Sequence, residues 1–388
     1  MAILTAIEDF VPDAQAWRRE LHQYPELQYD LPRTAQFVAE RLRALGCDEV
    51  QTSIGRTGVV GVIKGRKGDG GRVIGLRADM DALPIQETTN LPYRSATPGK
   101  MHACGHDGHT AMLLGAAGYL AKTRDFAGTA VVIFQPAEEG GAGAKAMIDD
   151  GLMDRFSIEE VYGMHNMPSL PVGAFALRKG PLLAAADHFT ISIEGRGGHA
   201  AQPHRGLDVI VAGAQIVTAL QTIVSRNVDP LDSCVVSVTK FDAGTTFNVL
   251  PQTAELLGTV RALNEPTRQH AERRVKEVVA GVASAAGVAA TIKYEVGYPP
   301  TFNHADQTDF AASVARQVVG DSSVATDIPP VMGAEDFSFM LQARPGAFIF
   351  VGNGDTAGLH NPAYDFNDAA LPFGIGYWAR LVETALAA

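Results

Sequence analysis

The first part of the chain alternates between two hydrophobic patterns. Apolar residues that recur every three or four positions indicate helices, and short apolar runs bounded by glycine or polar residues indicate buried strands. The predicted helices are Asp13–Leu21, Leu31–Leu45, about 109–123 and about 142–150, and the predicted strands are Gly58–Lys64, Arg72–Leu76, Thr129–Phe134 and Glu160–Met164. Strands that alternate with helices favour an α/β fold with a mostly parallel sheet covered on both faces.

A second pattern begins after Pro181. It predicts strands His188–Glu194, Ser233–Phe241, Thr253–Leu263 and Ala289–Val296 and helices Leu207–Val224 and Pro266–Ala285. The order β-α-β-β-α-β is the ferredoxin-like split unit. The first pattern then returns with helix Gln307–Val319, strand Ala347–Val351 and helix Leu371–Leu386. We therefore predict an α/β domain made of residues 1–182 and 298–388, interrupted by an α+β domain at 183–297.

Composition narrows the class of protein. Of 388 residues, 46% are hydrophobic and 19% are charged, which suits a well-buried globular protein. The net charge of −11 comes without a basic stripe, which argues against a nucleic-acid partner. The N-terminus lacks a signal-peptide pattern, and no stretch approaches the roughly 18 apolar residues of a membrane span. Three cysteines are too few for a disulfide framework, so we expect a cytoplasmic protein with no membrane partner.

Four groups that bind borderline transition metals lie close together between His102 and His109. The segment reads His-Ala-Cys-Gly-His-Asp-Gly-His, with Cys104 and His106 at its centre. Thiolate and imidazole are the ligands that zinc and similar metals prefer. A histidine-rich turn that caps the next helix is the alternative interpretation. This alternative is weaker, because other segments of the chain supply further side chains that can bind a metal.

Carboxylates and further histidines follow other predicted strands. Glu138 and Glu139 stand directly after the apolar run that ends at Phe134, and His165 and His360 follow two later strands. Open α/β sheets bind ligands at the carboxyl ends of their strands. One glutamate can therefore bind a metal while its neighbour takes a proton from the attacking water. Taken singly, the glutamates also fit a solvated acidic turn and each histidine fits an ordinary loop position.

Asp79 follows another predicted strand, within Arg-Ala-Asp-Met-Asp-Ala-Leu-Pro from Arg77 to Pro84. Metal-binding imidazoles and thiolates need partners that orient them, and Asp79 is the natural candidate. An ordinary turn aspartate is an equally good interpretation of this residue alone. The chain has no G-x-S-x-G, H-E-x-x-H or Walker lysine motif, which argues against a serine hydrolase of that type, a zincin and a P-loop enzyme.

Three of these segments resemble the signatures of the metallo-amidohydrolases that include aminoacylases and carboxypeptidases. The segments are His102–Asp107, Gln135–Glu139 and His360–Pro362, and they are most similar to the branch of hippurate hydrolases and plant indole-acetyl-amino-acid hydrolases. The resemblance covers nearly the whole chain. It implies a di-metal catalytic domain, with the inserted domain as a lid and dimerisation domain that closes over the site.

The resemblance also implies a role for each candidate residue. The positions that match ligands of two divalent metal ions are Cys104, His106, Glu139, His165 and His360. Cys104 would bridge where other members use aspartate. Glu138 matches the general base, which deprotonates the attacking water and then protonates the leaving amine. Asp79 matches the carboxylate that supports the metal site.

Three further positions of the inserted domain match the family pattern. His199, in Gly-Arg-Gly-Gly-His-Ala-Ala, matches a histidine that stabilises the tetrahedral oxyanion, often in the partner subunit's site, which implies a homodimer or a homotetramer. Asn248 and Arg261 match positions that hold the substrate carboxylate, a task that suits the planar guanidinium. The alternative interpretation of Asn248 is an ordinary residue of a hairpin turn, and that of Arg261 is a surface cation.

One position departs from the pattern of many relatives. Arg77 stands where they carry a ligand histidine, and the branch with the Cys-Gly-His motif shares this change. The resemblance thus implies a rearranged ligand set. Thiolate favours Zn²⁺, whereas the branch is associated with Mn²⁺. We expect one of these two metals, with Ni²⁺ and Co²⁺ as alternatives.

Together these observations predict a metal-dependent amidohydrolase that cleaves N-acyl or N-aroyl amino acids, such as hippurate or N-acetyl amino acids. A carboxypeptidase or dipeptidase of the same fold is the alternative within the class, since the shape of the acyl pocket distinguishes them. A non-catalytic protein that binds a small carboxylate is the alternative from another class. The filled positions of the base and the ligands argue against it.

Overall fold

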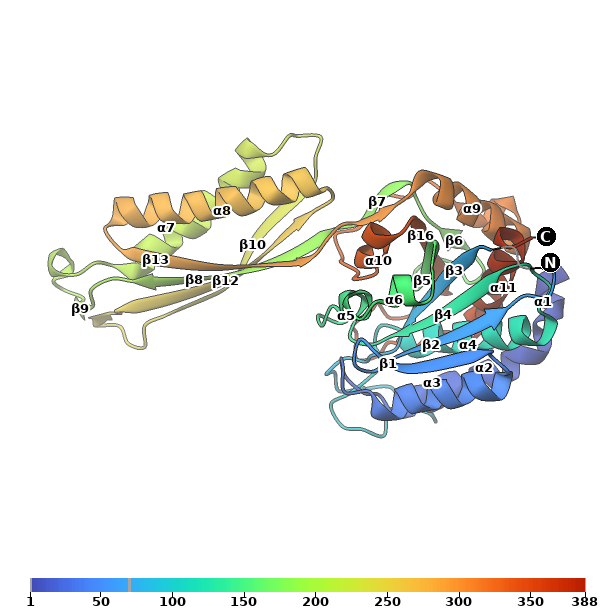
Figure 1. Cartoon of the computed structure of the whole chain (residues 1–388). Coiled ribbons are helices and arrows are strands. Elements are labelled where there is room, and N and C mark those ends of the chain that lie inside the picture. Colours follow the sequence, from blue (N-terminus) through green and yellow to red (C-terminus); the bar gives the residue numbers. More distant parts are fainter. Residues whose placement is uncertain (1, 69–70, 388) are drawn as a thin grey trace. The chain divides into compact units, whose positions relative to one another are not determined.

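The computed structural model describes residues 2–68 and 71–387. They divide into two compact units (Figure 1). Unit 1 contains the described residues up to Gly180, residues 302–329 and the described residues from Asp336 onward. Unit 2 contains Pro181–Thr301 and Pro330–Glu335. Unit 2 thus contains the residues of the predicted insertion at 183–297, together with 181–182, 298–301 and 330–335, which the prediction gave to the α/β domain.

An eight-stranded sheet forms the centre of unit 1. Its strands, in spatial order, are β1 (Glu49–Ile54), β2 (Gly58–Lys64), β4 (Thr129–Gln135), β3 (Val73–Asp79), β5 (Glu160–Pro168), β16 (Gly346–Gly354), β6 (Phe175–Ala176) and β15 (Val324–Ala325). Strands β4, β3, β5 and β16 pair in parallel, β1 and β2 pair antiparallel to their neighbours, and β6 pairs antiparallel with β16 and parallel with β15. The predicted α/β class with a mostly parallel sheet is confirmed.

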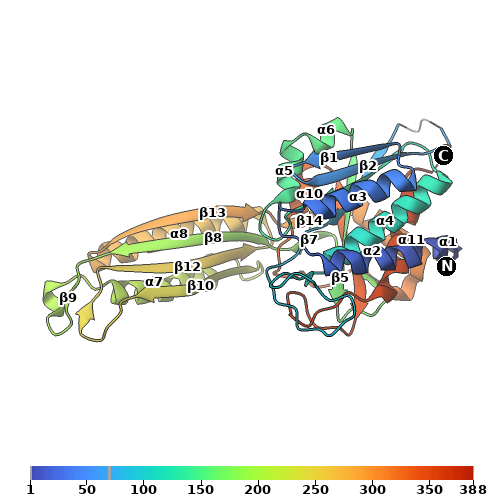
Figure 2. The same ribbon diagram turned by 90° about the horizontal axis from the view of Figure 1, so that it is seen from below.

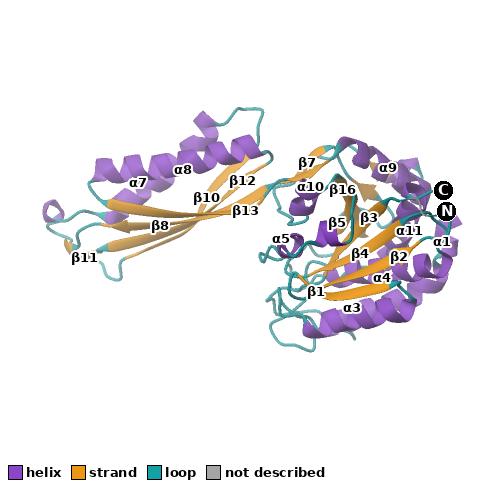
Figure 3. Ribbon diagram, in the orientation of Figure 1, coloured by secondary structure: helices purple, strands orange, loops and turns teal. Residues whose placement is uncertain are grey.

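Helices cover the sheet of unit 1 (Figure 3). They are α1 (Ala2–Ala6), α2 (Val11–Gln23), α3 (Pro32–Leu45), α4 (His106–Thr123), α5 (Gly143–Asp149), α6 (Leu152–Arg155), α9 (Ala305–Val319), α10 (Ser338–Ala343) and α11 (Leu371–Ala385), with short 3₁₀ turns at Glu8–Phe10, Asp321–Ser323 and Asp368–Ala370. Strands β3 and β4 are buried at nearly every position rather than at alternate ones, so both faces of the sheet are covered. Helix α4 is buried from His106 to Ala121, so its first turn lies inside the unit.

Unit 2 is a four-stranded antiparallel sheet with two helices on one face (Figures 1 and 2). The strand order is β10 (Cys234–Ala243), β12 (Thr253–Ala262), β8 (Ala185–Glu194) and β13 (Ala289–Tyr298), and the helices are α7 (Val209–Thr222) and α8 (Glu265–Ala286). Along β8, Phe189, Ile191 and Ile193 are buried in the core beneath the helices, and the positions between them are more exposed. This is the predicted split βαββαβ unit.

Shorter elements complete the two units. The strand pairs are β9 (Gly198–His199) with β11 (Val249–Leu250), and β7 (Gly180–Leu183) with β14 (Thr301–Asn303). A 3₁₀ turn covers Pro203–Arg205, and a π-helical turn, Ile223–Asn227, continues α7.

Helix α7 with this π-helical turn corrects one prediction. Val209–Asn227 has a mean hydropathy of 1.4 and is long and apolar enough to cross a membrane, by length and composition only. The prediction that no stretch approaches this is therefore wrong. One face of α7 packs into the core of unit 2 through Ile216 and Leu220. The other face exposes Ile210 and Val211.

Candidate metal centre

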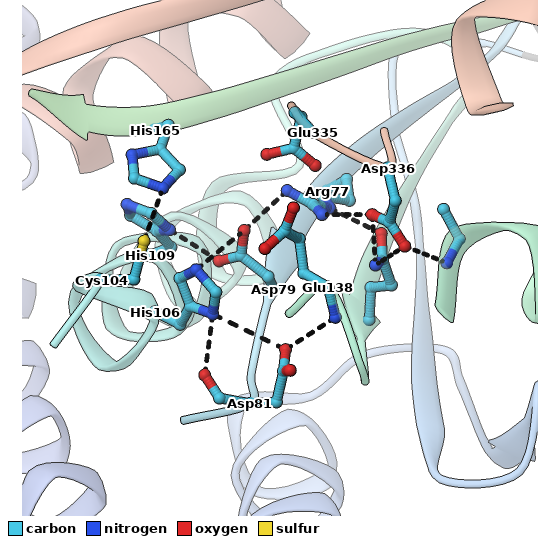
Figure 4. Close-up of polar contacts among 12 residues, drawn as sticks. Arg77, Asp79, Asp81, Cys104, His106, His109, Glu138, His165, Glu335 and Asp336 are labelled. Atoms are coloured by element: carbon cyan, nitrogen blue, oxygen red, sulfur yellow. Dashed lines mark hydrogen bonds and ion pairs between the residues drawn. The ribbon is translucent and has the colours of Figure 1, made fainter. Parts of the chain in front are cut away.

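The candidate residues of unit 1 gather around the carboxyl ends of the parallel strands (Figure 4). Asp79 is the last residue of β3, and the two glutamates follow the end of β4. His165 lies inside β5, because that strand continues to Pro168 instead of ending at Met164 as predicted. The loop after β16 carries His360.

Gly105 shapes the start of α4 between two candidate ligands. Its φ of 90° lies in the left-handed region, which favours glycine. A Cβ atom at this position would also collide with the side chains of Asn166 and Tyr364. Glycine therefore lets Cys104 and His106 stand close together at the beginning of a buried helix.

His106 and His165 each use Nδ1 for a hydrogen bond to a backbone carbonyl, so Nε2 of each ring is the nitrogen that can bind a metal. Nδ1 of His106 lies 2.8 Å from the carbonyl oxygen of Asp81, and Nδ1 of His165 lies 2.6 Å from that of Asn166. A carbonyl only accepts, so each Nδ1 carries a proton and donates it. Nε2 of His106 is buried and has no hydrogen-bond partner within the described part of the chain, and Nε2 of His165 lies 3.4 Å from Sγ of Cys104. This arrangement suits metal ligation through Nε2.

Cys104 is common to two groups of ligand atoms. One group is Cys104, His106 and His165, and the other is Cys104, Glu139 and His360; within each group the atoms lie within 4.8 Å of one another. Nε2 of His360 is 3.2 Å from Oε1 of Glu139. A thiolate shared in this way can bridge two cations, so the residues fit two divalent metal ions.

The pKa values of three of these candidate ligands are raised. Burial raises the pKa of the Cys104 thiol. Burial alone would lower the pKa of His106, but Asp79 and Cys104 raise it well above its usual range. Contacts with Cys104 and Glu139 raise the pKa of His360 to about 10. A bound divalent cation would take the place of protons on these groups, because each ligand must present a free lone pair.

The loop of His360 is tied to the other ligands through its backbone. His360 has a φ of 63°, in the left-handed region. Its N–H donates to the carbonyl oxygen of Ala103 at 2.8 Å, and the N–H of Thr88 donates to that of Pro362 at 2.9 Å. These bonds hold a surface loop next to Cys104.

Arg77 is a buried cation in this centre (Figure 4). Its Nη1 lies 2.7 Å from Oδ2 of Asp79, its Nη2 lies 3.1 Å from Oδ1 of Asp336, and its Nε donates to Oε1 of Gln135 at 2.8 Å. A guanidinium has no lone pair for a metal. Arg77 therefore contributes fixed charge and hydrogen bonds rather than ligation.

Asp79 is held on both carboxylate oxygens. His109 accepts the N–H of Asn166 at Nε2 over 2.9 Å, so its Nδ1 carries the proton and donates to Oδ1 of Asp79 at 2.6 Å. His109 thus has no free lone pair, although its ring lies near Asp79 and His106. Burial alone would raise the pKa of Asp79, but His106 and Arg77 hold it well below its usual range.

The remaining candidate residues belong to unit 2. His199 and Asn248 are neighbours, since β9 pairs with β11 and the N–H of Ala200 donates to the carbonyl oxygen of Asn248 at 3.1 Å. Arg261 lies in β12, opposite Ala186 of β8. Its Nη1 is buried, with no hydrogen-bond partner among the described residues. An unsatisfied guanidinium nitrogen of this kind suits the binding of an anion.

Several polar residues of the centre were not identified from the sequence. Asp81 lies two positions after Asp79, and Asn166 directly follows His165. Their closeness in sequence to predicted site residues could have identified them. Asp336 lies far from the motifs in sequence. Gln135 belongs to the motif Gln135–Glu139, but no role was predicted for it. Their contacts with Arg77 depend on tertiary packing that spacing does not reveal.

The chain is similar to known proteins over almost its whole length. The model of the family described as Peptidase family M20/M25/M40 matches residues 75–384. A hippurate hydrolase of Campylobacter jejuni is 44% identical over 98% of this chain and 98% of that protein. An N-acetyl-L-cysteine deacetylase of Bacillus subtilis is 42% identical over 91% of this chain and 83% of that protein. Thermostable carboxypeptidase 1 of Saccharolobus solfataricus is 41% identical over 91% of this chain and 90% of that protein.

A solved structure of similar fold is a dinuclear metal-binding peptidase of the M20 family from Bacillus subtilis. It superposes with a TM-score of 0.84 at 35% sequence identity, over 98% of this chain and 99% of that chain. Its description as dinuclear agrees with the two groups of ligand atoms that share Cys104.

We predict that Cys104→Ser weakens metal binding by at least about tenfold, because a hydroxyl replaces the thiolate that both groups share. Elemental mass spectrometry after dialysis measures the bound ions per chain. Cys47→Ser is the matched control, since Cys47 belongs to neither group. Equal metal content in both variants would remove Cys104 from the set of ligands.

Proposed function

Because the chain belongs to peptidase family M20/M25/M40, we propose that it is a metal-dependent amidohydrolase that cleaves N-acyl and N-aroyl amino acids into a carboxylic acid and an amino acid. The observation that carries this proposal is the complete donor set around Cys104, with the carboxylate of Glu138 next to it. The hippurate hydrolase and the deacetylase among the similar proteins support this substrate class.

The residues of unit 1 divide the chemistry between them. Two divalent cations at the groups that share Cys104 would polarise the amide carbonyl and lower the pKa of the attacking water. Glu138 lies within 4.8 Å of the ligand atoms of His106 and Glu139, in reach of a water held there. It takes the proton of that water and passes it to the leaving amine. Asp79, ionised and held on both oxygens, keeps His109 and its neighbours oriented.

The residues of unit 2 bind the substrate in this proposal. The orphaned Nη1 of Arg261 supports the binding of the substrate carboxylate, with Asn248 as a second donor. His199 stabilises the oxyanion. We assign it to the site of a partner subunit, so the enzyme is a homodimer or a larger assembly built from it. The exposed apolar residues Ile210 and Val211 of α7 support a surface for self-association.

The metal and the compartment belong to the same proposal. The thiolate and imidazole donors favour Zn²⁺, while the branch that the motifs resemble points to Mn²⁺; Ni²⁺ and Co²⁺ remain alternatives. The three cysteines Cys47, Cys104 and Cys234 are free. Free thiols fit a reducing compartment, and we place the enzyme in the cytoplasm.

A peptidase activity is the second candidate function. The 41% identity with a carboxypeptidase supports it, since both reactions attack an amide bond next to a free carboxylate. The size of the group on the acyl side of the bond distinguishes the two activities.

We predict that the metal-loaded protein releases amine from N-benzoyl, N-acetyl and indole-acetyl amino acids faster than from dipeptides. Chelation should abolish the activity, and adding back Zn²⁺ or Mn²⁺ in separate samples should restore it and identify the metal. Faster cleavage of dipeptides would favour the peptidase. Silence on every substrate, with metal shown to be bound, would contradict both activities.

Glu138→Gln should lower kcat by about 10²–10⁴-fold, because an amide takes no proton from water. Metal content should stay at the wild-type level. Glu139→Gln, one residue away, is the contrasting variant and should lose metal as well as activity. The assignment of the base fails if Glu138→Gln loses metal in proportion to its activity.

The assignment of His199 to the partner's site predicts complementation. Glu138→Gln and His199→Ala chains, carrying different tags, are co-expressed and the mixed dimers purified. One site of such a dimer combines an intact Glu138 with the partner's intact His199, so activity should rise far above that of either parent. Activity no higher than in the parent dimers would place His199 in the site of its own chain.

A further inference from the structure

The turn that carries Glu138 and Glu139 has an unusual backbone. Ala137, directly before the pair, has a φ of 54°, and Ala142, shortly after it, has a φ of 55°. Non-glycine residues in this region persist only where surrounding contacts fix them. Two adjacent side chains that perform different tasks also need the peptide between them to keep one orientation. The groups that hold the middle of this turn therefore determine where both side chains point.

One carboxylate binds both amides of the pair. The N–H of Glu138 donates to Oδ1 of Asp81 at 2.9 Å, and the N–H of Glu139 donates to Oδ2 at 3.1 Å. Asp81 is buried, two positions after the end of β3. Such charged hydrogen bonds in a buried place are stronger than those between neutral groups. The two-point attachment prevents the turn from rotating about either bond.

Asp81 also fixes a candidate ligand from another element. Its carbonyl oxygen accepts the Nδ1 proton of His106 at 2.8 Å, and Nε2 of that ring lies 3.7 Å from Oδ2 of Asp79 (Figure 4). The side chain of Asp81 thus holds the turn after β4, and its main chain holds the first residue of α4. Both carboxylate oxygens of Asp81 are engaged by N–H groups, so the residue acts through its neighbours.

We propose that Asp81 is a positioning residue that fixes the orientation of Glu138 and Glu139 relative to His106. The inference rests on the proposed function, in which these three residues are the base and two ligands. Gln28 contributes two other contacts to the turn: its carbonyl oxygen accepts the N–H of Ala137 at 3.1 Å, and its Nε2 donates to the carbonyl oxygen of Glu139 at 3.2 Å. Asp81 holds the N–H groups of both glutamates.

Asp81→Asn tests this proposal with little change of shape. The amide keeps one acceptor but turns an NH₂ group toward the second N–H, so one of the two bonds is lost. Asp48→Asn is the matched control. Asp48 also accepts a backbone N–H, that of Lys64 at 2.7 Å, and belongs to none of the candidate metal groups among the described residues.

The first readout is hydrogen exchange of the metal-free chain, measured by mass spectrometry. In Asp81→Asn, the peptide that contains Glu138 and Glu139 should exchange at least about tenfold faster than in the wild type. In Asp48→Asn that peptide should be unchanged, while the peptide that contains Lys64 exchanges faster. Unchanged exchange at the glutamates in Asp81→Asn would overturn the proposal, whatever the activity.

The second readout is made on the metal-loaded enzyme. Asp81→Asn should lower kcat at least about tenfold with KM within about twofold, because the base is misplaced while substrate binding is kept. Metal affinity, measured by titration, should also fall. Wild-type kcat combined with faster exchange would overturn the positioning role. If the amide variant does not fold, Asp81→Glu, which keeps the charge but moves the carboxylate, should show the same pattern.

The two readouts separate this inference from the function on which it rests. A wild-type enzyme that cleaves nothing in the substrate panel counts against the proposed function. In that case exchange and metal affinity still decide whether Asp81 anchors the turn and supports the ligands.

Discussion

Parallel pairing of β4, β3, β5 and β16 is the constraint on which the rest of unit 1 depends. Parallel neighbours end at the same edge of a sheet, so the residues that follow them meet there whatever their distance in sequence. The strands themselves are covered on both faces and are almost wholly apolar. Apart from Arg77 within β3 and His165 within β5, the ionisable side chains of the centre therefore lie at strand ends, in the loops after them and at the start of α4. The charged side chains of this part of the chain therefore cluster at the candidate metal centre.

The main chain orients the rings of the candidate ligands His106 and His165. Carbonyl oxygens of Asp81 and Asn166 select the tautomers of His106 and His165, and a backbone N–H of Asn166 removes His109 from the ligand set. These donors and acceptors belong to strands and turns fixed by the sheet. Ligand geometry is thus set by secondary structure, and a binding site of this kind is prepared before any ion enters.

The sequence was sufficient for the architecture and for most of the polar residues at the strand ends. Periodicity identified both the α/β pattern and the split βαββαβ unit, because each has a distinct hydrophobic period. It missed β1, which lies at the sheet edge and is only partly buried, and it underrated the apolar length of α7. The residue types near Cys104 pointed to a metal. The contacts of Asp336 with Arg77 and Gln135 could not be found, because a link between residues 77 and 336 leaves no local signal.

Arg77 also affects the electrostatic cost of burying the carboxylates next to it. The carboxylates of Asp79 and Asp336 are buried, and two such charges would repel each other without a cation nearby. The guanidinium is positively charged at every physiological pH, so it supplies that cation from within the chain. One positive charge thus offsets part of the negative charge of the two carboxylates from within the chain. The contacts of Arg77 with Asp79 and Asp336 therefore form between side chains of the chain itself, and they need no bound ion.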